Sequence, residues 1–234
     1  MHFPRIPLFI LALLFLTCPH TAAQGRQSVH GVPLTMRSFG TGSQRVLVIG
    51  GMHGDERAAL QLAPVLEDSL AAAATRLRCT VFWVRALNPD GIARGTRSNA
   101  RGIDLNRNFP TKDFGAKARA SRYFGGTTGG SEPETRLVMT LVDSLRVAMI
   151  ITLHAPLACV NHDGPAGSHA RRLAALMKLP HRSDIGYATP GSLGTWAGRE
   201  RSISVLTVEL PARVTPRSLR SHASALVTFL RELR

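Results

Sequence analysis

The sequence predicts a three-layer α/β/α domain built on a mostly parallel mixed β-sheet. Short apolar runs typical of buried strands alternate along the chain with amphipathic segments typical of helices, and this alternation packs helices against a parallel sheet. Hydrophobic residues make up 44% of the chain, which is ample material for a buried core. Neither an internal repeat nor a linker divides residues 24–234, so we expect them to form one domain.

The first half of this pattern contains three strands and one helix. An apolar run that ends in Gly50 and Gly51 is expected to be a buried strand, and leucine and valine side chains then gather on one helical face. The next strand is rich in β-branched and aromatic residues, and the turn sequence NPDG at 88–91 ends it. We expect an edge strand at 32–38, strands at 45–49 and 80–87, and a helix at 57–70.

The second half begins with a long loop at 92–131 that is rich in Gly, Asn and Arg. Loops of this length are usually functional or disordered. Pro133 occupies a first-turn position that a helix tolerates, so a helix is expected to begin there. The remaining elements are expected to be strands at 147–153 and 203–210 and helices at 168–177 and 216–233.

Residues 1–23 have the pattern of a secretory signal peptide. Arg5 precedes an apolar run at 8–16, and small residues lead to Ala23, which gives the basic region, hydrophobic region and cleavage site of such a signal. The run is too short to span a bilayer, so no stable membrane insertion is expected. Cys18 is not preceded by the small residues of a lipoprotein signal. We expect cleavage near Ala23 and a periplasmic or secreted protein.

The formal net charge is +14, which bears on non-specific partners rather than on the fold. Either the surface is a solvated, arginine-rich one, or it attracts an anionic polymer such as a cell-wall glycan. Aromatic residues are only 6% of the chain, which argues against a stacking platform for nucleic acid. Cys79 and Cys159 could pair in an exported protein or remain buried thiols, and the sequence leaves both open.

His53 and Glu56 follow the strand at 45–49 directly, on a turn at its carboxyl end. Open α/β sheets bind ligands at this edge. Imidazole and carboxylate three residues apart can reach one point, and both suit Zn²⁺. Alone, this pair is a weak signal, because short motifs match often by chance. Glu209 is a second candidate, because a carboxylate in an apolar strand costs free energy unless it is paired or lies at the strand's end.

Taken together, the motifs resemble those of the zinc metallocarboxypeptidase family. They occur in the family's order over nearly the whole chain after residue 23, and the short length and the segment 99–110 look most like the murein peptide amidase branch. The resemblance implies a carboxypeptidase-like fold. The motifs are HGDE at 53–56, NPDG at 88–91, RGTR at 94–97, DLNRNFP at 104–110, SEPE at 131–134, and the single residues His154, Tyr187 and Glu209.

The resemblance implies a zinc site and a general base. His53, Glu56 and His154 would bind one zinc ion per chain and leave the fourth position open for water, as a catalytic site requires. Asp104 would accept the proton of the other ring nitrogen of His53 and fix its orientation. Glu209 would take a proton from the zinc-bound water and pass it to the leaving amine.

The same resemblance implies the substrate contacts. Arg94 would polarise the scissile carbonyl and support the oxyanion, although Arg97 and Arg101 are close enough in sequence to blur this assignment. Asn106 and Arg107 would hold the substrate's terminal carboxylate, for which a guanidinium supplies a bidentate fork. Tyr187 would close over that carboxylate.

The side-chain pocket departs from that of digestive carboxypeptidases. Its floor is expected near Gly194, with the hydroxyls of Thr189, Ser192 and Thr195 beside it, which leaves room for a longer polar side chain. Diaminopimelate fits this description, so we expect hydrolysis of the bond between γ-D-glutamate and diaminopimelate in a small, cell-wall-derived peptide. The predicted export is a further departure, because the familiar murein peptide amidases act in the cytoplasm.

Two other functions remain open besides a general metallocarboxypeptidase. An N-acyl-amino-acid deacylase of the aspartoacylase type shares the metal and Asp-x-Asn-Arg elements, but the contexts of Arg94, Glu134 and Tyr187 favour a peptidase. A catalytically inactive wall-binding module is the third possibility, against which the intact ligand set and Glu209 argue. The sequence leaves the oligomeric state open.

Overall fold

Seven strands form one sheet in the order β1-β3-β2-β4-β7-β5-β6. The structure is a computed structural model that describes residues 26–115 and 121–233. The strands are β1 (Arg37–Phe39), β2 (Gln44–Ile49), β3 (Cys79–Val84), β4 (Met149–His154), β5 (Leu157–Asp163), β6 (His181–Arg182) and β7 (Ser204–Pro211).

The centre of the sheet is parallel, and antiparallel pairs lie towards its edges. β2 pairs in parallel with β3 and β4, and β4 pairs in parallel with β7. β1 is antiparallel to β3, and β5 is antiparallel to β7. The predicted mostly parallel mixed sheet is therefore confirmed. Because β2, β4 and β7 run in one direction, their carboxyl ends meet at one edge, where such sheets bind ligands.

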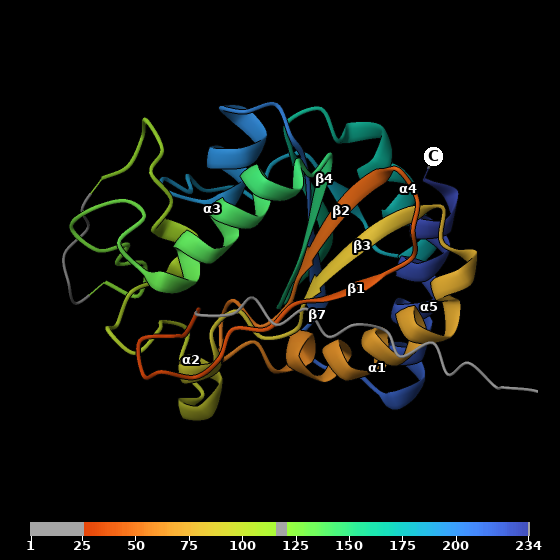
Figure 1. Ribbon diagram of the computed structural model, residues 1–234, viewed down its shortest axis with the longest axis horizontal. Coiled ribbons are helices and arrows are strands. Elements are labelled where there is room, and N and C mark those ends of the chain that lie inside the picture. Colours follow the sequence, from red (N-terminus) through yellow and green to blue (C-terminus); the bar gives the residue numbers. More distant parts are fainter. Residues whose placement is uncertain (1–25, 116–120, 234) are drawn as a thin grey trace, which may run out of the picture.

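Helices cover both faces of this sheet (Figure 1). α1 (Arg57–Ala73), α4 (Gly167–Met177) and α5 (Pro216–Glu232) pack on one face, and α3 (Pro133–Leu145) packs on the other. Side chains alternate along β2 as the two-residue period of a strand requires. Val46 and Val48 join the core under the first three helices, whereas Leu47 and Ile49 join the core under α3. The three-layer arrangement is confirmed.

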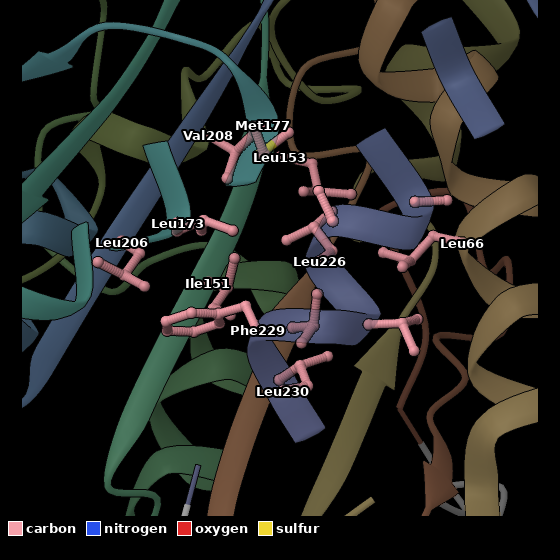
Figure 2. Packing of buried hydrophobic residues seen from close by; sticks show 14 of the residues in the cluster. Leu66, Ile151, Leu153, Leu173, Met177, Leu206, Val208, Leu226, Phe229 and Leu230 are labelled. Atoms are coloured by element: carbon pink, nitrogen blue, oxygen red, sulfur yellow. The ribbon is translucent and has the colours of Figure 1, made fainter. Parts of the chain in front are cut away.

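The core between the sheet and α5 holds the strands that reach the site. Phe229 of α5 lies beside Ile151 of β4, and Leu226 of α5 and Leu206 of β7 belong to the same cluster (Figure 2). Burying each such side chain contributes about 1.5–3 kcal/mol relative to leaving it exposed. β4 and β7 are therefore firmly held over the length that precedes their functional ends.

The sequence NPDG begins a helix instead of forming only a turn. The side chain of Asn88 accepts a hydrogen bond from the Gly91 amide (2.8 Å), and Pro89 is the first residue of α2 (Pro89–Arg94). Asn as N-cap followed by Pro is a strong helix start, and the same residue types also favour turns. The predicted loop from residue 92 therefore starts later, after the left-handed Gly95.

Three further elements were not expected from the sequence. These are β5, β6 and the π-helical segment η3 (Gly194–Arg199). The short 3₁₀ turn η2 (Leu105–Arg107) also interrupts the long loop, and η1 (Ala74–Arg76) extends the end of α1. Within the described part of the chain, Cys79 and Cys159 are both buried thiols that are not bonded to each other, which decides between the two alternatives left open above.

The predicted signal peptide, with Arg5, Cys18 and Ala23, lies outside the described residues. Within residues 26–115 and 121–233, no helix has the length and apolar character needed to cross a bilayer.

Candidate active site

Three residues from separate segments meet at the carboxyl edge of the sheet. His53 lies in the turn after β2, Glu56 is the N-cap of α1, and His154 is the last residue of β4. The turn packs tightly, because a Cβ on Gly54 would lie 2.1 Å from the backbone carbon of Gly91. Only glycine fits there, and its absence of a side chain lets the turn approach α2 and aim His53 inward.

The ligand atoms of these three residues converge on one point. Nδ1 of His53 lies 2.8 Å from one carboxylate oxygen of Glu56, and Nδ1 of His154 lies 2.9 Å from the other. The two Nδ1 atoms are 3.2 Å apart, and all the ligand atoms lie within 4.8 Å of one another. Within the described part of the chain, His53, Glu56 and His154 are the group of this kind that could hold a metal ion.

This donor set fits zinc. Two imidazole nitrogens and a carboxylate are the three-ligand set of catalytic zinc sites, which keep a further position open. Two ring nitrogens only 3.2 Å apart can both turn their lone pairs to one bound cation. Burial of all three side chains also fits, because buried charges pair or bind metal.

Asp104 and Arg97 hold the ligands in place from outside. Asp104 lies 2.9 Å from Nε2 of His53, so the other ring nitrogen, Nδ1, is the one turned towards Glu56. Nε of Arg97 donates to the second oxygen of Asp104 (2.9 Å), and Nη1 of Arg97 donates to Glu56 (3.2 Å). The structure thus brings Asp104 to the place that the sequence assigned to it.

Charges in this cluster shift the pKa values in opposite directions. Burial lowers the pKa of His53, but Glu56 and Asp104 outweigh burial and raise that pKa to about 9. Burial raises the pKa of Glu56, but the two histidines outweigh it and hold the pKa far below its usual range. The pKa of Asp104 is lowered too, because His53 and Arg97 outweigh its burial. Both carboxylates are therefore ionised over the whole neutral range.

Glu209 lies beside this cluster without joining it. It is on β7, it lines the same cavity as His53 and His154, and one carboxylate oxygen accepts the amide of Leu157 (3.3 Å). Burial raises the pKa of Glu209 above its ordinary value. A carboxylate with a raised pKa next to a metal-ligand set is suited to accept and return a proton near neutral pH.

Asn106, Arg107 and Tyr187 line the other side of the cavity. Oδ1 of Asn106 accepts the amide of Leu193 (2.9 Å), which leaves its amino group as the donor. Arg107 is only 5% exposed, and its buried Nε has no hydrogen-bond partner among residues 26–115 and 121–233. A buried guanidinium with an unmet donor favours an anionic ligand. Tyr187 is 49% exposed at the rim.

The structure places Arg97, and not Arg94, in the cavity. Arg94 is the last residue of α2, is exposed, and reaches only the backbone oxygen of Ala100 at 3.5 Å. Arg97 lines the cavity beside Glu56. The structure does not bring Arg94 to the cavity, because residues 89–94 form a helix that ends in the left-handed Gly95, which separates the directions of the two side chains.

Tyr123 is a cavity residue that the sequence analysis did not select. Its ring centroid lies 5.3 Å from the guanidinium carbon of Arg97 and 5.3 Å from that of Arg107, within cation–π range. The ring therefore braces both arginines. The one sequence feature that could have pointed to Tyr123 is the rarity of tyrosine, because the chain contains only two.

Part of the predicted pocket floor lines the cavity. Gly194, Thr189 and Ser192 line it. The hydroxyl of Thr195 instead accepts a hydrogen bond from Ser192 (3.1 Å). Asp163 and Arg199 also line the cavity, and neither was expected there.

Comparison with known proteins agrees with this geometry. The sequence model of the zinc carboxypeptidase family matches residues 20–163. Murein peptide amidase A of Escherichia coli K12 is 31% identical over 225 residues, which cover 91% of this chain and 90% of that protein. The Vibrio campbellii murein peptide amidase A is 35% identical over 217 residues, or 87% of this chain and 85% of that one.

A solved structure gives the same result. The crystal structure of murein-tripeptide amidase MpaA from Escherichia coli O157 matches with a TM-score of 0.76 at 29% identity and covers 89% of this chain and 91% of that one. The described fold, the zinc-binding donor set and these similarities agree with one another. The chain belongs to the zinc carboxypeptidase family, and it is a zinc-dependent hydrolase.

Proposed function

We propose that this enzyme hydrolyses the C-terminal amide bond of short murein peptides, between γ-D-glutamate and diaminopimelate. Similarity to murein peptide amidases over about nine tenths of the chain supports the substrate class. The observation that carries the reaction type is one cavity lined by the metal-ligand set, Glu209 and the buried guanidinium of Arg107. Such a cavity can hold a terminal carboxylate at one end and the adjacent amide bond at the other.

His53, Glu56 and His154 would hold the zinc ion, and Asp104 would keep the ring of His53 in the orientation that leaves Nδ1 for the metal. Bound zinc supplies Lewis-acid chemistry, which acidifies water and polarises a carbonyl. Glu209 would take a proton from the attacking water and deliver it to the leaving amine. Its raised pKa suits both steps, because the group must accept the proton and then release it.

Arg97 takes the role that the sequence suggested for Arg94. Its guanidinium is fixed by Asp104 and Glu56 at the edge of the metal-ligand set, where negative charge develops on the carbonyl oxygen. A preorganised donor at this place stabilises the transition state more than the ground state.

Asn106, Arg107 and Tyr187 would bind the terminal carboxylate. Arg107 offers the unpartnered Nε, and Asn106 offers its amino group. The exposed Tyr187 can reach a ligand from the rim. This clamp selects substrates with a free carboxylate next to the scissile bond, which favours a hydrolase over a binding module. An N-acyl amino acid has the same carboxylate, so the similarity to murein peptide amidases is what favours a peptide amidase over a deacylase.

We also propose that the enzyme acts outside the cytoplasm after cleavage near Ala23. The support is the order of Arg5, the apolar run at 8–16 and the small residues before Ala23, which is that of a signal peptide.

The test is a mass-resolved digest of L-Ala-γ-D-Glu-meso-diaminopimelate by the purified mature protein. The expected products are L-Ala-D-Glu and diaminopimelate. An acyl-amino acid incubated in parallel should be left intact. Cleavage of ordinary peptides with no action on the murein tripeptide would refute the proposed substrate and leave the family assignment in place.

A further inference from the structure

The carboxylate of Asp163 lies in the cavity against Gly194. Asp163 ends β5, and its side chain is only 12% exposed. A Cβ on Gly194 would lie 2.1 Å from Oδ2 of Asp163 and 2.8 Å from its Cγ, which is closer than atoms can approach. Glycine at position 194 therefore makes the space that the Asp163 carboxylate occupies, and the expected pocket floor is acidic rather than merely small.

Arg199 completes this feature. It lies in η3, and its Nε donates to Oδ1 of Asp163 at 2.7 Å. The Arg199 side chain is 65% exposed, and both residues line the cavity. Within residues 26–115 and 121–233, neither Oδ2 of Asp163 nor the two Nη groups of Arg199 have a hydrogen-bond partner. The pair thus offers one acceptor and several donors to a ligand.

The pair as a whole is neutral, and this decides which side chain it fits. An ammonium alone, as in lysine, would meet a carboxylate whose charge a guanidinium already compensates. A carboxylate alone would meet Arg199 but lie beside Asp163, at the cost of like-charge repulsion. A side chain that ends in both an ammonium and a carboxylate satisfies both partners with charge-assisted hydrogen bonds.

We propose that Asp163 and Arg199 form a subsite for a zwitterionic side-chain end, with the ammonium on Oδ2 of Asp163 and the carboxylate on the guanidinium of Arg199. This inference rests on the proposed function, and it names the residues that recognise the distal end of diaminopimelate. Asp184 also lines the cavity, and its Oδ1 accepts the amide of Gly186 (2.7 Å).

The experiment compares three tripeptides, L-Ala-γ-D-Glu-X. X is meso-diaminopimelate, L-lysine, which lacks the distal carboxylate, or L-2-aminopimelate, which lacks the distal amine. We expect the wild-type kcat/KM for diaminopimelate to exceed each of the other two by roughly tenfold or more, the worth of one charge-assisted contact. In Asp163→Asn the advantage over aminopimelate should disappear, and in Arg199→Gln the advantage over lysine should disappear.

Two controls separate recognition from folding. Arg172→Gln and Glu232→Gln remove another exposed Nε–carboxylate pair (2.8 Å), which joins α4 to α5 away from the cavity, and both should keep the wild-type preferences. Gly194→Ala leaves both charged groups in the chain but displaces the carboxylate of Asp163. It should reproduce the selectivity of Asp163→Asn, with an unchanged circular dichroism spectrum.

Each outcome is decisive. A wild type that cleaves all three peptides equally overturns the subsite and leaves the proposed function intact. Equal losses on all three peptides in Asp163→Asn and Arg199→Gln would also overturn the subsite, because a purely structural role has no selectivity. A wild type that cleaves none of the three overturns the proposed function and the subsite together.

Discussion

His154 and Glu209 are direct backbone partners in neighbouring parallel strands. His154 is the last residue of β4, and its Cα pairs with that of Glu209 on β7. Parallel pairing puts the two side chains at the same level of the sheet, so a metal ligand and a proton acceptor stand next to each other at the edge where β4 ends. The core that fixes β4 and β7 against α5 thus also fixes the distance between ligand and base.

The first prediction uses this relationship to separate the two roles. Glu209→Gln keeps the shape of the side chain but removes the proton acceptor, so the zinc content should stay at the wild-type level. Turnover should fall by roughly 10²-fold or more. Glu232→Gln, a surface change at α5, is the matched control and should retain full turnover. Near-normal turnover of Glu209→Gln would move the base to another residue.

The second prediction concerns the metal. Purified mature protein should contain about one zinc ion per chain by elemental analysis. A chelator should abolish activity, and added zinc should restore it. His154→Ala should lose zinc, whereas His181→Ala should keep it, because His181 contacts His162 rather than the ligand set. Zinc and activity retained by His154→Ala would contradict the assignment of that ligand.

The third prediction concerns the pH dependence of the metal-free protein. The folded-state pKa of His53 is about 9, above its ordinary value of 6.5. A raised pKa stabilises the fold fully below about pH 6.5, and this contribution is lost as the pH rises through about 9. The Tm of chelated protein should therefore fall over this window.

His53→Asn should show a smaller fall in Tm over the same window, and this difference isolates the residue. Zinc requires the unprotonated ring, so its affinity should rise with pH in the same range. If the chelated wild type and chelated His53→Asn show the same pH dependence of Tm, the raised pKa of His53 is refuted.

The sequence was sufficient for most of the fold because the central strands are fully buried. Runs such as residues 46–49 are apolar at every position and adopt one structure, and the segment that follows has a clear helical period. The strand order brings His53, His154 and Glu209 to one edge of the sheet, but the family resemblance was needed to assign their roles. β5 was missed because its sequence mixes apolar and polar residues, so its pairing with β7 is a tertiary effect.

The parts of the site that the sequence did not predict depend on contacts between distant segments. Gly194 argues against a helix by its propensity, yet it begins η3, and the space that a side chain would fill there holds the carboxylate of Asp163. Arg94 and Arg97 are indistinguishable by residue type, and only the end of α2 at Gly95 determines which of them faces the cavity.

That distinction gives the fourth prediction. Arg97→Gln should lower kcat/KM by roughly 10²-fold or more, in line with the loss of one oxyanion donor. Arg94→Gln changes the same residue type three positions earlier on an exposed surface, so its activity should stay at the wild-type level. Kinetics of the two variants under identical conditions make the comparison. A large loss in Arg94→Gln with little effect of Arg97→Gln would restore the original assignment.

The last prediction concerns the carboxylate clamp. Amidating the carboxylate next to the scissile bond removes the charge that Nε of Arg107 is placed to meet. Each hydrogen bond to a charged group contributes about 1.5–3 kcal/mol, so the amidated tripeptide should be cleaved at least about tenfold more slowly. Arg107→Ala should slow the free tripeptide and remove most of the difference between the two substrates.

Arg94→Ala is the matched control and should keep the difference between the free and amidated peptides. Tyr123→Leu tests how the clamp is held, because the ring of Tyr123 contacts both Arg97 and Arg107. It should reduce the same difference partially, since Arg107 would lose its aromatic contact but keep its charge. If the wild type cleaves free and amidated peptides equally well, Arg107 does not bind the terminal carboxylate, and its unpartnered Nε must serve another anion.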